Sequence, residues 1–509
     1  MFPTLSNSSK GERCQKNILM RLPIVRKPIK VIPDPKRVIA RYFFNGEVRA
    51  KEVIMRVMNL SEAEVFGIVS PLLQEYSKRH RNITQVLLRH FRNVKNVLDQ
   101  LEIIPENLTE PRKLLLGSYF THEYSIESAA FFNPSIVEDP DQSELVAGSK
   151  RIIISFRAVG EGHISSIVFR RALIDKDNNI SVIPVGNYVG EAEIIRNAQY
   201  EKKLFLEKAK SAKIDEEVLE EIGNKLEDTF DYSSLRKMVL EFRKQEGNDI
   251  KKIQYEKILW LSDSYYEISF SLDTDISDRV IFPISELERK GIEDARFVRF
   301  REENGDIMYY ATYTAFDGSI IMPKLLQTKD FYSFYIKPLH GRGAQNKNLA
   351  LFPRQINGKY AMMSRIDGRN NYIMYSENMN LWEDPIMLQQ PLHFWEFTQI
   401  GNCGSPIETE KGWLVITHGV GAMRRYCLGA CLLKLDDPTV ELGRLKEPLL
   451  IPNEDEREGY VPNVVYSCGS ILHGGKLVIP YGLSDYSSSF VTVDLHDVLE
   501  RILMDSENQ

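Results

Sequence analysis

From about Leu114 onward, the chain consists of short apolar segments separated at short intervals by turn residues. Segments typical of strands are 151–158, 164–169, 265–272, 308–313, 360–364, 413–417, 427–433 and 476–480. Gly, Asp and Asn lie between them, and Asn357-Gly358 is a strong signal for a two-residue hairpin. Many short strands at this spacing predict an all-β propeller or sandwich. Periodicity alone does not fix the number of blades.

Two stretches have helical spacing instead. The first, 51–101, contains a predicted helix start at Ser61 with Glu64 in the capping-box position. The second, 191–260, is rich in Glu, Lys, Leu and Ile and predicts helices over 192–212, 214–226 and 232–245. We therefore expect a tail and helical region over 1–113 and a β domain over 114–500 that carries a helical insertion at 191–260.

No site motif lies within either helical stretch. Residues 1 to about 30 are polar, basic and without period, so we expect a loose tail whose deletion leaves activity unchanged. The basic run Lys78-Arg79-His80-Arg81 is expected to be a solvated helix end, because no aromatic stacking residues interleave with it.

Composition excludes several classes of protein. A chain of 509 residues is too long for one small core. The net charge of -6 gives no support for a nucleic-acid or membrane-surface partner, and no run of ~18 apolar residues predicts a membrane span. Five sparse cysteines without a Cys-x-x-Cys pair argue against a disulfide framework. With no signal-peptide pattern at the N-terminus, we expect a cytoplasmic protein.

The segment from Gly291 to Phe297 places two adjacent acids, Glu293 and Asp294, at the start of an alternating strand. Neighbouring residues on a regular strand point to opposite faces, so we expect only one of the two acids to face a pocket. Arg296, two residues after Asp294, is expected on the same side, where it holds that carboxylate or binds the same ligand. A turn with a surface ion pair is the simpler alternative.

Several polar residues lie at or near the ends of predicted strands, next to tight turns. They are Arg157, Asp294, Lys347, Arg365, His418 and Asp485. A single residue of this kind is ordinary. Six of them in a strand-repeat fold fit a central funnel that is lined by several blades. Acids together with basic side chains fit the binding of a polyol and an anion. We expect no metal site.

The signature Gly291-Ile292-Glu293-Asp294-Ala295-Arg296 resembles that of glycoside hydrolase family 130, the β-mannoside phosphorylases and β-mannosidases. Further motifs keep the family's order over about 115–500. They are Asn133-Pro134, Phe156-Arg157-Ala158, Leu351-Phe352-Pro353 with Ile356-Asn357-Gly358-Lys359-Tyr360, Gly412-Trp413-Leu414 with His418-Gly419-Val420, Glu458-Gly459-Tyr460-Val461-Pro462-Asn463-Val464, and Tyr481-Gly482 with Asp485. The helical N-terminus and the 191–260 insertion depart from compact members of the family.

The resemblance implies a five-bladed β-propeller with the site at its axis, and inversion at a β-mannoside. It implies that Asp294 is the general acid, acting through a sugar hydroxyl, with inorganic phosphate as co-substrate and no other cofactor. By the same resemblance Lys347, Arg365 and His418 would bind phosphate. We expect Asn133, Arg157, Arg296 and Asp485 to bind the sugar.

Two other functions remain open on the sequence. An inverting β-mannosidase would keep a carboxylate base, with the carboxyls ~6.5–9.5 Å apart to admit a water. Glu161 and Glu458 are spare acids that could serve. A non-catalytic carbohydrate-binding propeller is the second alternative, although it has no use for a buried acid facing cations. Homo-oligomers through the helical regions are expected as a further possibility.

Overall fold

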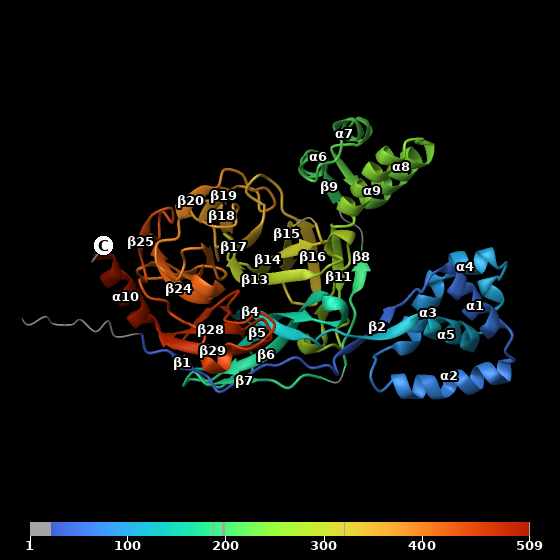
Figure 1. Cartoon of the computed structure of the whole chain (residues 1–509), viewed down its shortest axis with the longest axis horizontal. Coiled ribbons are helices and arrows are strands. Elements are labelled where there is room, and N and C mark those ends of the chain that lie inside the picture. Colours follow the sequence, from blue (N-terminus) through green and yellow to red (C-terminus); the bar gives the residue numbers. More distant parts are fainter. Residues whose placement is uncertain (1–21, 187, 196–198, 320, 508–509) are drawn as a thin grey trace, which may run out of the picture.

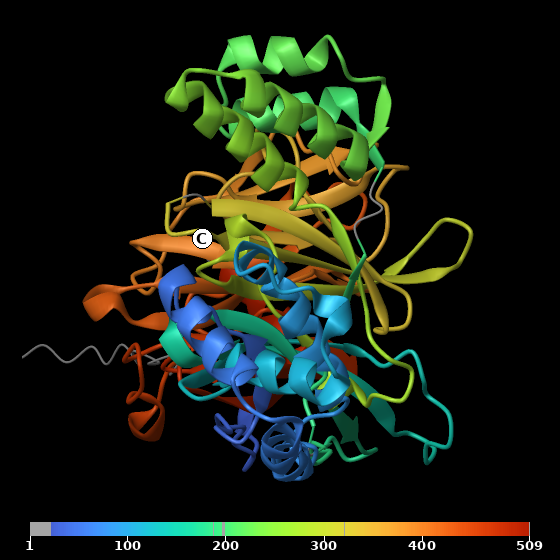
Figure 2. The same ribbon diagram turned by 90° about the vertical axis from the view of Figure 1, so that its right-hand side faces the viewer.

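The computed structural model describes residues 22–186, 188–195, 199–319 and 321–507. This part of the chain is mostly β structure, and two groups of helices stand off the strands (Figure 1). Turning the molecule by 90° shows the two helical groups on the same side of the β part, separated from each other (Figure 2). Within the described residues the strands form five sheets of four to six strands and two of two strands.

We number the five larger sheets I to V in chain order. Sheet I contains β4 (Ala130–Glu138), β5 (Lys150–Val159), β6 (Ser165–Ile174), β7 (Ile180–Val182) and β12 (Val280–Ile281). Sheet II contains β8 (Glu193–Ile195), β11 (Tyr266–Ser269), β13 (Ile292–Arg301), β14 (Ile307–Phe316), β15 (Ile321–Thr328) and β16 (Ser333–Pro338). Sheet III contains β17 (Lys347–Leu351), β18 (Tyr360–Arg365), β19 (Asn371–Ser376) and β20 (Ile386–Gln389).

The last two sheets are built from the C-terminal part and from one N-terminal strand. Sheet IV contains β21 (Gln399–Asn402), β22 (Ile407–Thr409), β23 (Gly412–Val420), β24 (Tyr426–Leu433) and β25 (Glu441–Arg444). Sheet V contains β1 (Val25–Arg26), β26 (Val465–Tyr466), β27 (Ile471–His473), β28 (Lys476–Leu483) and β29 (Ser487–Asp494). The C-terminal helix α10 (Leu495–Glu507) follows β29 directly.

Five clusters of the apolar core each contain residues from two of these sheets. Residues that share a cluster are Ile153 with Phe297 (sheets I and II), Val298 with Leu349 (II and III), Met363 with Val415 (III and IV), Leu414 with Ile479 (IV and V), and Val478 with Phe156 (V and I). Neighbours on one strand, such as Phe297 and Val298, belong to different clusters because successive side chains point to opposite faces. Each sheet is therefore covered on both faces by other sheets.

The predicted hairpin at Asn357-Gly358 is confirmed. Ile356 and Lys359 exchange both backbone hydrogen bonds, and the two residues between them have φ values of 51° and 73°. Left-handed φ at both central positions is the type I′ geometry that favours Asn followed by Gly.

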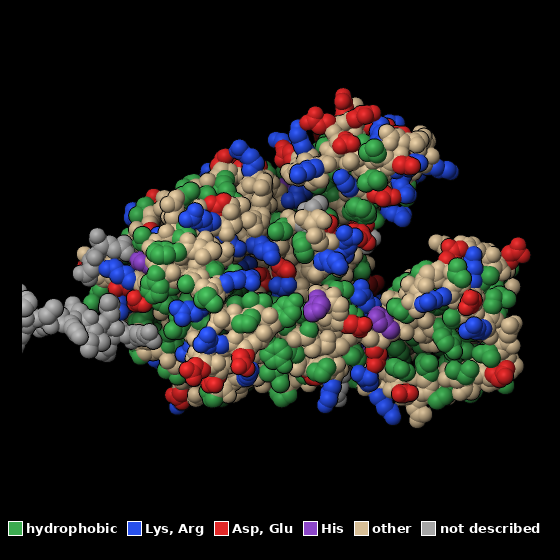
Figure 3. All heavy atoms as spheres, in the orientation of Figure 1, with side chains coloured by type: hydrophobic (Ala, Val, Ile, Leu, Met, Phe, Trp, Pro, Cys, Tyr) green, Lys and Arg blue, Asp and Glu red, His purple; other side chains and the backbone are tan. Residues whose placement is uncertain are grey.

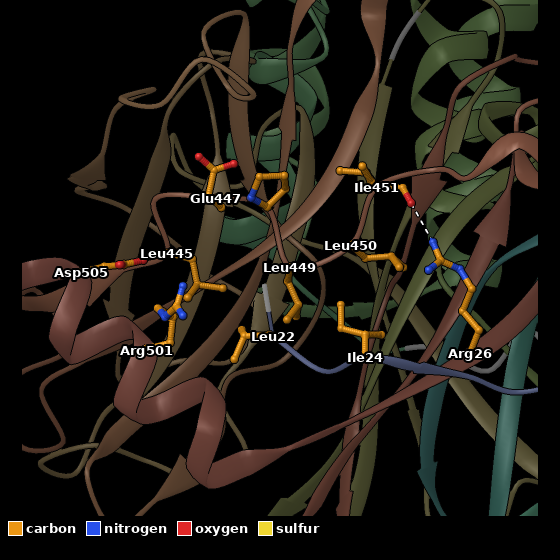
Figure 4. Close-up of a pocket in the computed structure, with 11 residues that line it drawn as sticks. Leu22, Ile24, Arg26, Leu445, Glu447, Leu449, Leu450, Ile451, Arg501 and Asp505 are labelled. Atoms are coloured by element: carbon orange, nitrogen blue, oxygen red, sulfur yellow. Dashed lines mark hydrogen bonds between the residues drawn. The ribbon is translucent and has the colours of Figure 1, made fainter. Parts of the chain in front are cut away.

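The predicted loose tail is wrong for residues 22 onward, while residues 1–21 lie outside the described part of the chain. β1 pairs with β29, and Arg26 holds Glu456 with its Nε 2.9 Å from Oε1. Figure 4 shows Leu22 and Ile24 beside apolar side chains near α10, around a cavity of about 200 Å³. Deleting residues 1–30 would thus remove a strand, so we now expect it to destabilise sheet V.

Five helices form the N-terminal group. They are α1 (Glu47–Met58), α2 (Glu62–Tyr76), α3 (Ile83–Asn93), α4 (Lys95–Gln100) and α5 (Glu110–Tyr119). The capping box of Ser61 and Glu64 is confirmed. The expected start of β structure near Leu114 is wrong, because α5 continues to Tyr119 and the next strand, β3 (Thr121–Ser125), pairs with β2 (Val38–Tyr42).

The basic run after α2 is not a solvated helix end. His80 is buried and its Nε2 lies 2.7 Å from Oε1 of Glu123, whose other oxygen accepts from Arg79. Arg81 pairs with Asp273 in the β part of the chain. The run therefore ties the N-terminal helices to the strands.

The insertion also differs in detail from its prediction. Its helices are α6 (Lys202–Ser211), α7 (Glu216–Gly223), α8 (Tyr232–Gln245) and α9 (Asp249–Ser262), the last of which was not predicted as a separate helix. Helix was expected at β9 (Gln199–Glu201), which instead pairs with β10 (Thr229–Asp231), a strand between two of the predicted helices. Among the helices of the described ranges, none has the length and apolar content needed to cross a membrane.

Candidate active site

A cavity of about 230 Å³ is lined by residues from or next to all five larger sheets. Its lining consists of Asn133, Arg157, Glu293, Asp294, Lys347, Asn348, Arg365, Gln399, His418, Arg424, Tyr426, Val461, Val464, Tyr466 and Asp485. Seven of the eight residues predicted for the site are among them, and Arg296 is the exception. On the face seen in Figure 3, basic side chains gather with acidic ones between them, near the region where Figure 1 labels β13 and β17.

The prediction that Glu293 and Asp294 point to opposite faces is wrong. The register of β13 against β14 shifts between Glu293 and Arg296, and Asp294 has a left-handed φ of 56°. This bulge breaks the alternation, so both carboxylates line the same cavity. Gly291, at the start of the segment, has a φ of 120° and approaches Ser165 so closely that a Cβ would lie 2.4 Å from its Oγ.

Asp294 is held by two neighbours from sheet I. Asn133 donates from Nδ2 to Oδ1 at 2.7 Å, and Nη1 of Arg157 lies 3.7 Å from the same oxygen. Burial raises the pKa of the Asp294 carboxyl, but the charges of Arg157, Arg296 and Lys347 and the Asn133 hydrogen bond outweigh it and leave the pKa below its usual range. At neutral pH this group is therefore a carboxylate.

Glu293 bridges two cations across the cavity. Its Oε1 accepts from Nη2 of Arg157 at 2.8 Å, and its Oε2 accepts from Nζ of Lys347 at 2.6 Å. Glu293 therefore orients Arg157 and Lys347 rather than offering a free base.

Arg296 lies beneath the cavity instead of in its lining. It is 3% exposed, and it donates to the backbone carbonyl of Asp294 at 3.0 Å and to the Tyr466 hydroxyl at 2.7 Å. It does not donate a hydrogen bond to the Asp294 carboxylate, as the sequence had suggested, but it fixes the backbone of the bulge. Its contact with sugar stays a prediction. Its burial favours a role in positioning the bulge over direct contact with a ligand.

His418 differs from the cation expected from the sequence. Its Nδ1 lies 3.2 Å from the carbonyl of Asn402, so Nδ1 carries the proton and donates. Its Nε2 then accepts from Nη1 of Arg365 at 3.2 Å. Burial, followed by the charges of Arg365 and Arg296, lowers the pKa of His418 well below its usual value. The imidazole is neutral and orients Arg365.

Close packing supports this histidine. A Cβ on Gly401 would lie 2.3 Å from Cε1 of His418, so only glycine fits there. The ring of Tyr466 meets the imidazole edge-on, with centroids 4.8 Å apart. These contacts leave the ring no room to turn.

Asp485 is the third carboxyl group of the cavity. Burial raises its pKa to about 6, and the neighbouring Asp294 contributes, although Arg157 and Arg424 act in the opposite direction. Its φ of 52° places it in the turn between β28 and β29. Near pH 6 this group can exist in either protonation state.

Sequence reasoning missed several lining residues, notably Asn348, Arg424, Tyr426 and Tyr466. Asn348 donates to the Tyr466 hydroxyl at 3.0 Å and to the Asn402 carbonyl at 3.0 Å. Two of them could have been predicted from their positions, because Asn348 follows Lys347 directly and Tyr466 lies just after the 458–464 motif. The spare acids Glu161 and Glu458 do not line the cavity.

A buried carboxyl group beside cationic donors is typical of enzymes that transfer a proton while they bind an anion. The chain belongs to glycoside hydrolase family 130: residues 232–503 match the family model described as beta-1,4-mannooligosaccharide phosphorylase. The matched region includes the residues from Glu293 to Asp485 but not Asn133 or Arg157.

Two relatives and one solved structure illustrate the similarity. The 1,2-beta-oligomannan phosphorylase of Thermoanaerobacter sp. (strain X514) is 34% identical over 42% of this chain and 72% of its own. The beta-1,2-mannobiose phosphorylase of Listeria innocua serovar 6a is 30% identical over 55% of this chain and 78% of its own. A structure of beta-1,2-mannobiose phosphorylase from Listeria innocua, in complex with beta-1,2-mannobiose, covers 75% of this chain and 93% of its own, with 24% identity and a TM-score of 0.45.

Proposed function

We propose that the protein cleaves β-mannosidic bonds with inversion, by phosphorolysis that releases mannose 1-phosphate. The observation that carries this proposal is the cation-rich cavity beside Asp294. Four cationic side chains, Arg157, Lys347, Arg365 and Arg424, face three carboxyl groups there. Two of the cations are already paired with Glu293, whereas in the described part of the chain the side chain of Arg365 donates to a neutral imidazole.

The proposed reaction is a single displacement. A phosphate oxygen attacks the anomeric carbon from the face opposite the glycosidic oxygen, and a new carbon–oxygen bond forms as the glycosidic bond breaks. The leaving oxygen receives its proton from Asp294 through a hydroxyl of the sugar. Phosphate is already an anionic nucleophile, so no second carboxylate has to activate it, but cations must offset its charge near the acid.

Phosphate binding would also prepare the acid. The cations around Asp294 hold its pKa low. A bound dianion offsets those charges and raises the pKa, because a nearby negative charge favours the protonated carboxyl. The acid would thus gain its proton when the nucleophile is in place. Arg365 and Lys347 are the proposed phosphate ligands, with His418 orienting Arg365.

For the fold we propose that sheets I to V are the blades of one five-bladed propeller, with the cavity at its axis. The supporting observation is the ring of shared clusters, in which each sheet packs on the next and sheet V packs on sheet I. We propose that the N-terminal helical region extends through α5 to Tyr119 and that the β domain follows it to about residue 500, with the helical insertion at 191–260. Homo-oligomers through the helices and a cytoplasmic location stay predictions.

The test is incubation with β-1,2- and β-1,4-linked mannobiose, with and without phosphate. Mannose 1-phosphate formed only with phosphate is the expected result. Free mannose at the same rate without phosphate would instead support an inverting β-mannosidase. Binding without any turnover would leave a non-catalytic carbohydrate-binding protein.

A further inference from the structure

A second hollow, of about 350 Å³, lies on sheet II outside the cavity that contains Asp294. Side chains that line it include Gln199, Tyr265, Glu267, Gln327, Tyr335 and Lys337. They come from β11 and the residue before it, from β15 and β16, and from β9 at the base of the helical insertion (Figure 1). The insertion therefore supplies part of the wall.

Strand register sets Tyr335 between two hydrogen-bonding side chains. Tyr335 on β16 is paired with Glu267 on β11 and with Gln327 on β15. Directly paired residues of antiparallel strands share a face and have Cβ atoms about 4.5–5.5 Å apart. The tyrosine ring thus has a carboxylate on one side and an amide on the other.

Tyr335 and the two side chains beside it are open to solvent or only half-buried. Tyr335 is 53% exposed, although it is a large aromatic residue in the middle of a strand. Glu267 and Gln327 are half-buried, and Gln199 is exposed. Within the described residues, no hydrogen bond or ion pair is seen for the side chains of Glu267, Gln327 or Tyr335. An open aromatic face flanked by free donors and acceptors fits a ligand that has an apolar face and a polar edge.

We propose that this hollow is a second, non-catalytic binding site for a β-linked mannooligosaccharide. A hexopyranose ring presents C–H groups on its faces and hydroxyls around its edge. One face can lie on Tyr335 while hydroxyls reach Glu267 and Gln327. The choice of mannose rests on the proposed function, whereas recognition of a pyranose ring rests on the hollow alone.

The hollow is separate from the active site. Asp294 lies on β13, and β16 is three strands further along sheet II. With neighbouring strands ~4.8 Å apart, the two strands are roughly 14 Å apart. The site would therefore hold a longer chain or a second molecule, and a mannobiose bound at Asp294 would not need it.

The test compares Tyr335→Ala with Tyr335→Phe and with the control Tyr119→Ala, which removes an exposed tyrosine from α5. Calorimetric titration with a long β-linked mannooligosaccharide, without phosphate, should show ~10-fold or greater loss of affinity in Tyr335→Ala only. Phosphorolysis of mannobiose should remain unchanged in all three variants. Melting temperatures establish that each variant is folded.

Unaltered affinity in Tyr335→Ala, or no binding of the oligosaccharide at a second site of the wild type, would overturn the inference. An equal loss of mannobiose turnover would also overturn it, because the residue would then act through the active site. If no mannoside is phosphorolysed but affinity still falls in Tyr335→Ala, the binding site stands and the proposed function fails.

Discussion

The two sides of the central cavity differ in how completely they are paired. The acid side, formed by Asn133, Arg157, Glu293 and Asp294 from sheets I and II, contains direct hydrogen bonds among its own members. The cation side, formed by Arg365, His418 and Arg424 from sheets III and IV, contains one hydrogen bond between Arg365 and a neutral imidazole. Lys347 connects the two sides through Glu293.

This difference indicates what each side lacks. The side chains of the acid side hold one another through hydrogen bonds, so their geometry is set before a ligand binds. Arg365 is buried, and among the described residues its side chain donates to a neutral imidazole rather than to a carboxylate, so its charge is left without a counter-ion, which is costly. An anion would complete the cation side. Substitutions that alter one side and leave the other intact therefore test the proposed mechanism.

The largest effect is expected on the acid side. Asp294→Asn keeps the shape of the side chain but removes the carboxyl proton, so kcat should fall by roughly 10²–10⁴-fold. Mannose should still act as a ligand, and the melting temperature should change little. Asp306→Asn, in the exposed turn between β13 and β14, is the matched control. Wild-type turnover by Asp294→Asn would remove this residue from the role of acid.

A smaller and more selective effect is expected on the cation side. Arg365→Ala removes charge-assisted hydrogen bonds worth on the order of 1.5–3 kcal/mol each, so the half-saturating phosphate concentration should rise ~10-fold or more. Inhibition by mannose should hardly change. Arg342→Ala, which removes an exposed arginine of a surface ion pair, provides the control. Equal losses of phosphate and mannose affinity would contradict the separation of the two sides.

Local patterns in the sequence predicted much of this arrangement. The alternation around Phe297, the capping box at Ser61 and the Asn357-Gly358 hairpin depend on residues close together in the chain, and the structure confirms the last two directly. Of the eight site residues predicted from the strand ends and the signature motifs, seven line one cavity.

What the sequence could not predict depends on distant contacts. The pairing of Val25 with Thr492 joins the two ends of the chain, and no local period signals it. The left-handed conformation of Asp294 is set by the bulge on β13, whereas its residue type only permits it. The neutral state of His418 follows from its burial and from Arg365, which lies 3.2 Å away.

Asp485 allows a finer test of the acid side. The charge of Asp294 contributes to the raised pKa of Asp485, and such an effect is mutual, so Asp485→Asn should lower the pKa of Asp294 and move the alkaline limb of kcat to lower pH. At pH 7 the carboxylate is disfavoured in the fold, so the variant should melt at a higher temperature than the wild type. That advantage should shrink as the pH falls through about 6, where Asp485 becomes protonated in the folded protein. An unchanged pH profile would show that the two carboxyls do not interact.

The smallest expected change concerns His418, whose imidazole is predicted to keep the same protonation state. Between pH 5 and 8, ¹⁵N NMR should show a neutral ring with the proton on Nδ1, because Nδ1 donates to Asn402 and Nε2 accepts from Arg365. If the His418 ring instead gains a proton near pH 6, it would lose its acceptor for Arg365 and become a cation. The cation side would then bind phosphate with one charge more than the structure indicates, and phosphate affinity would rise as the pH falls.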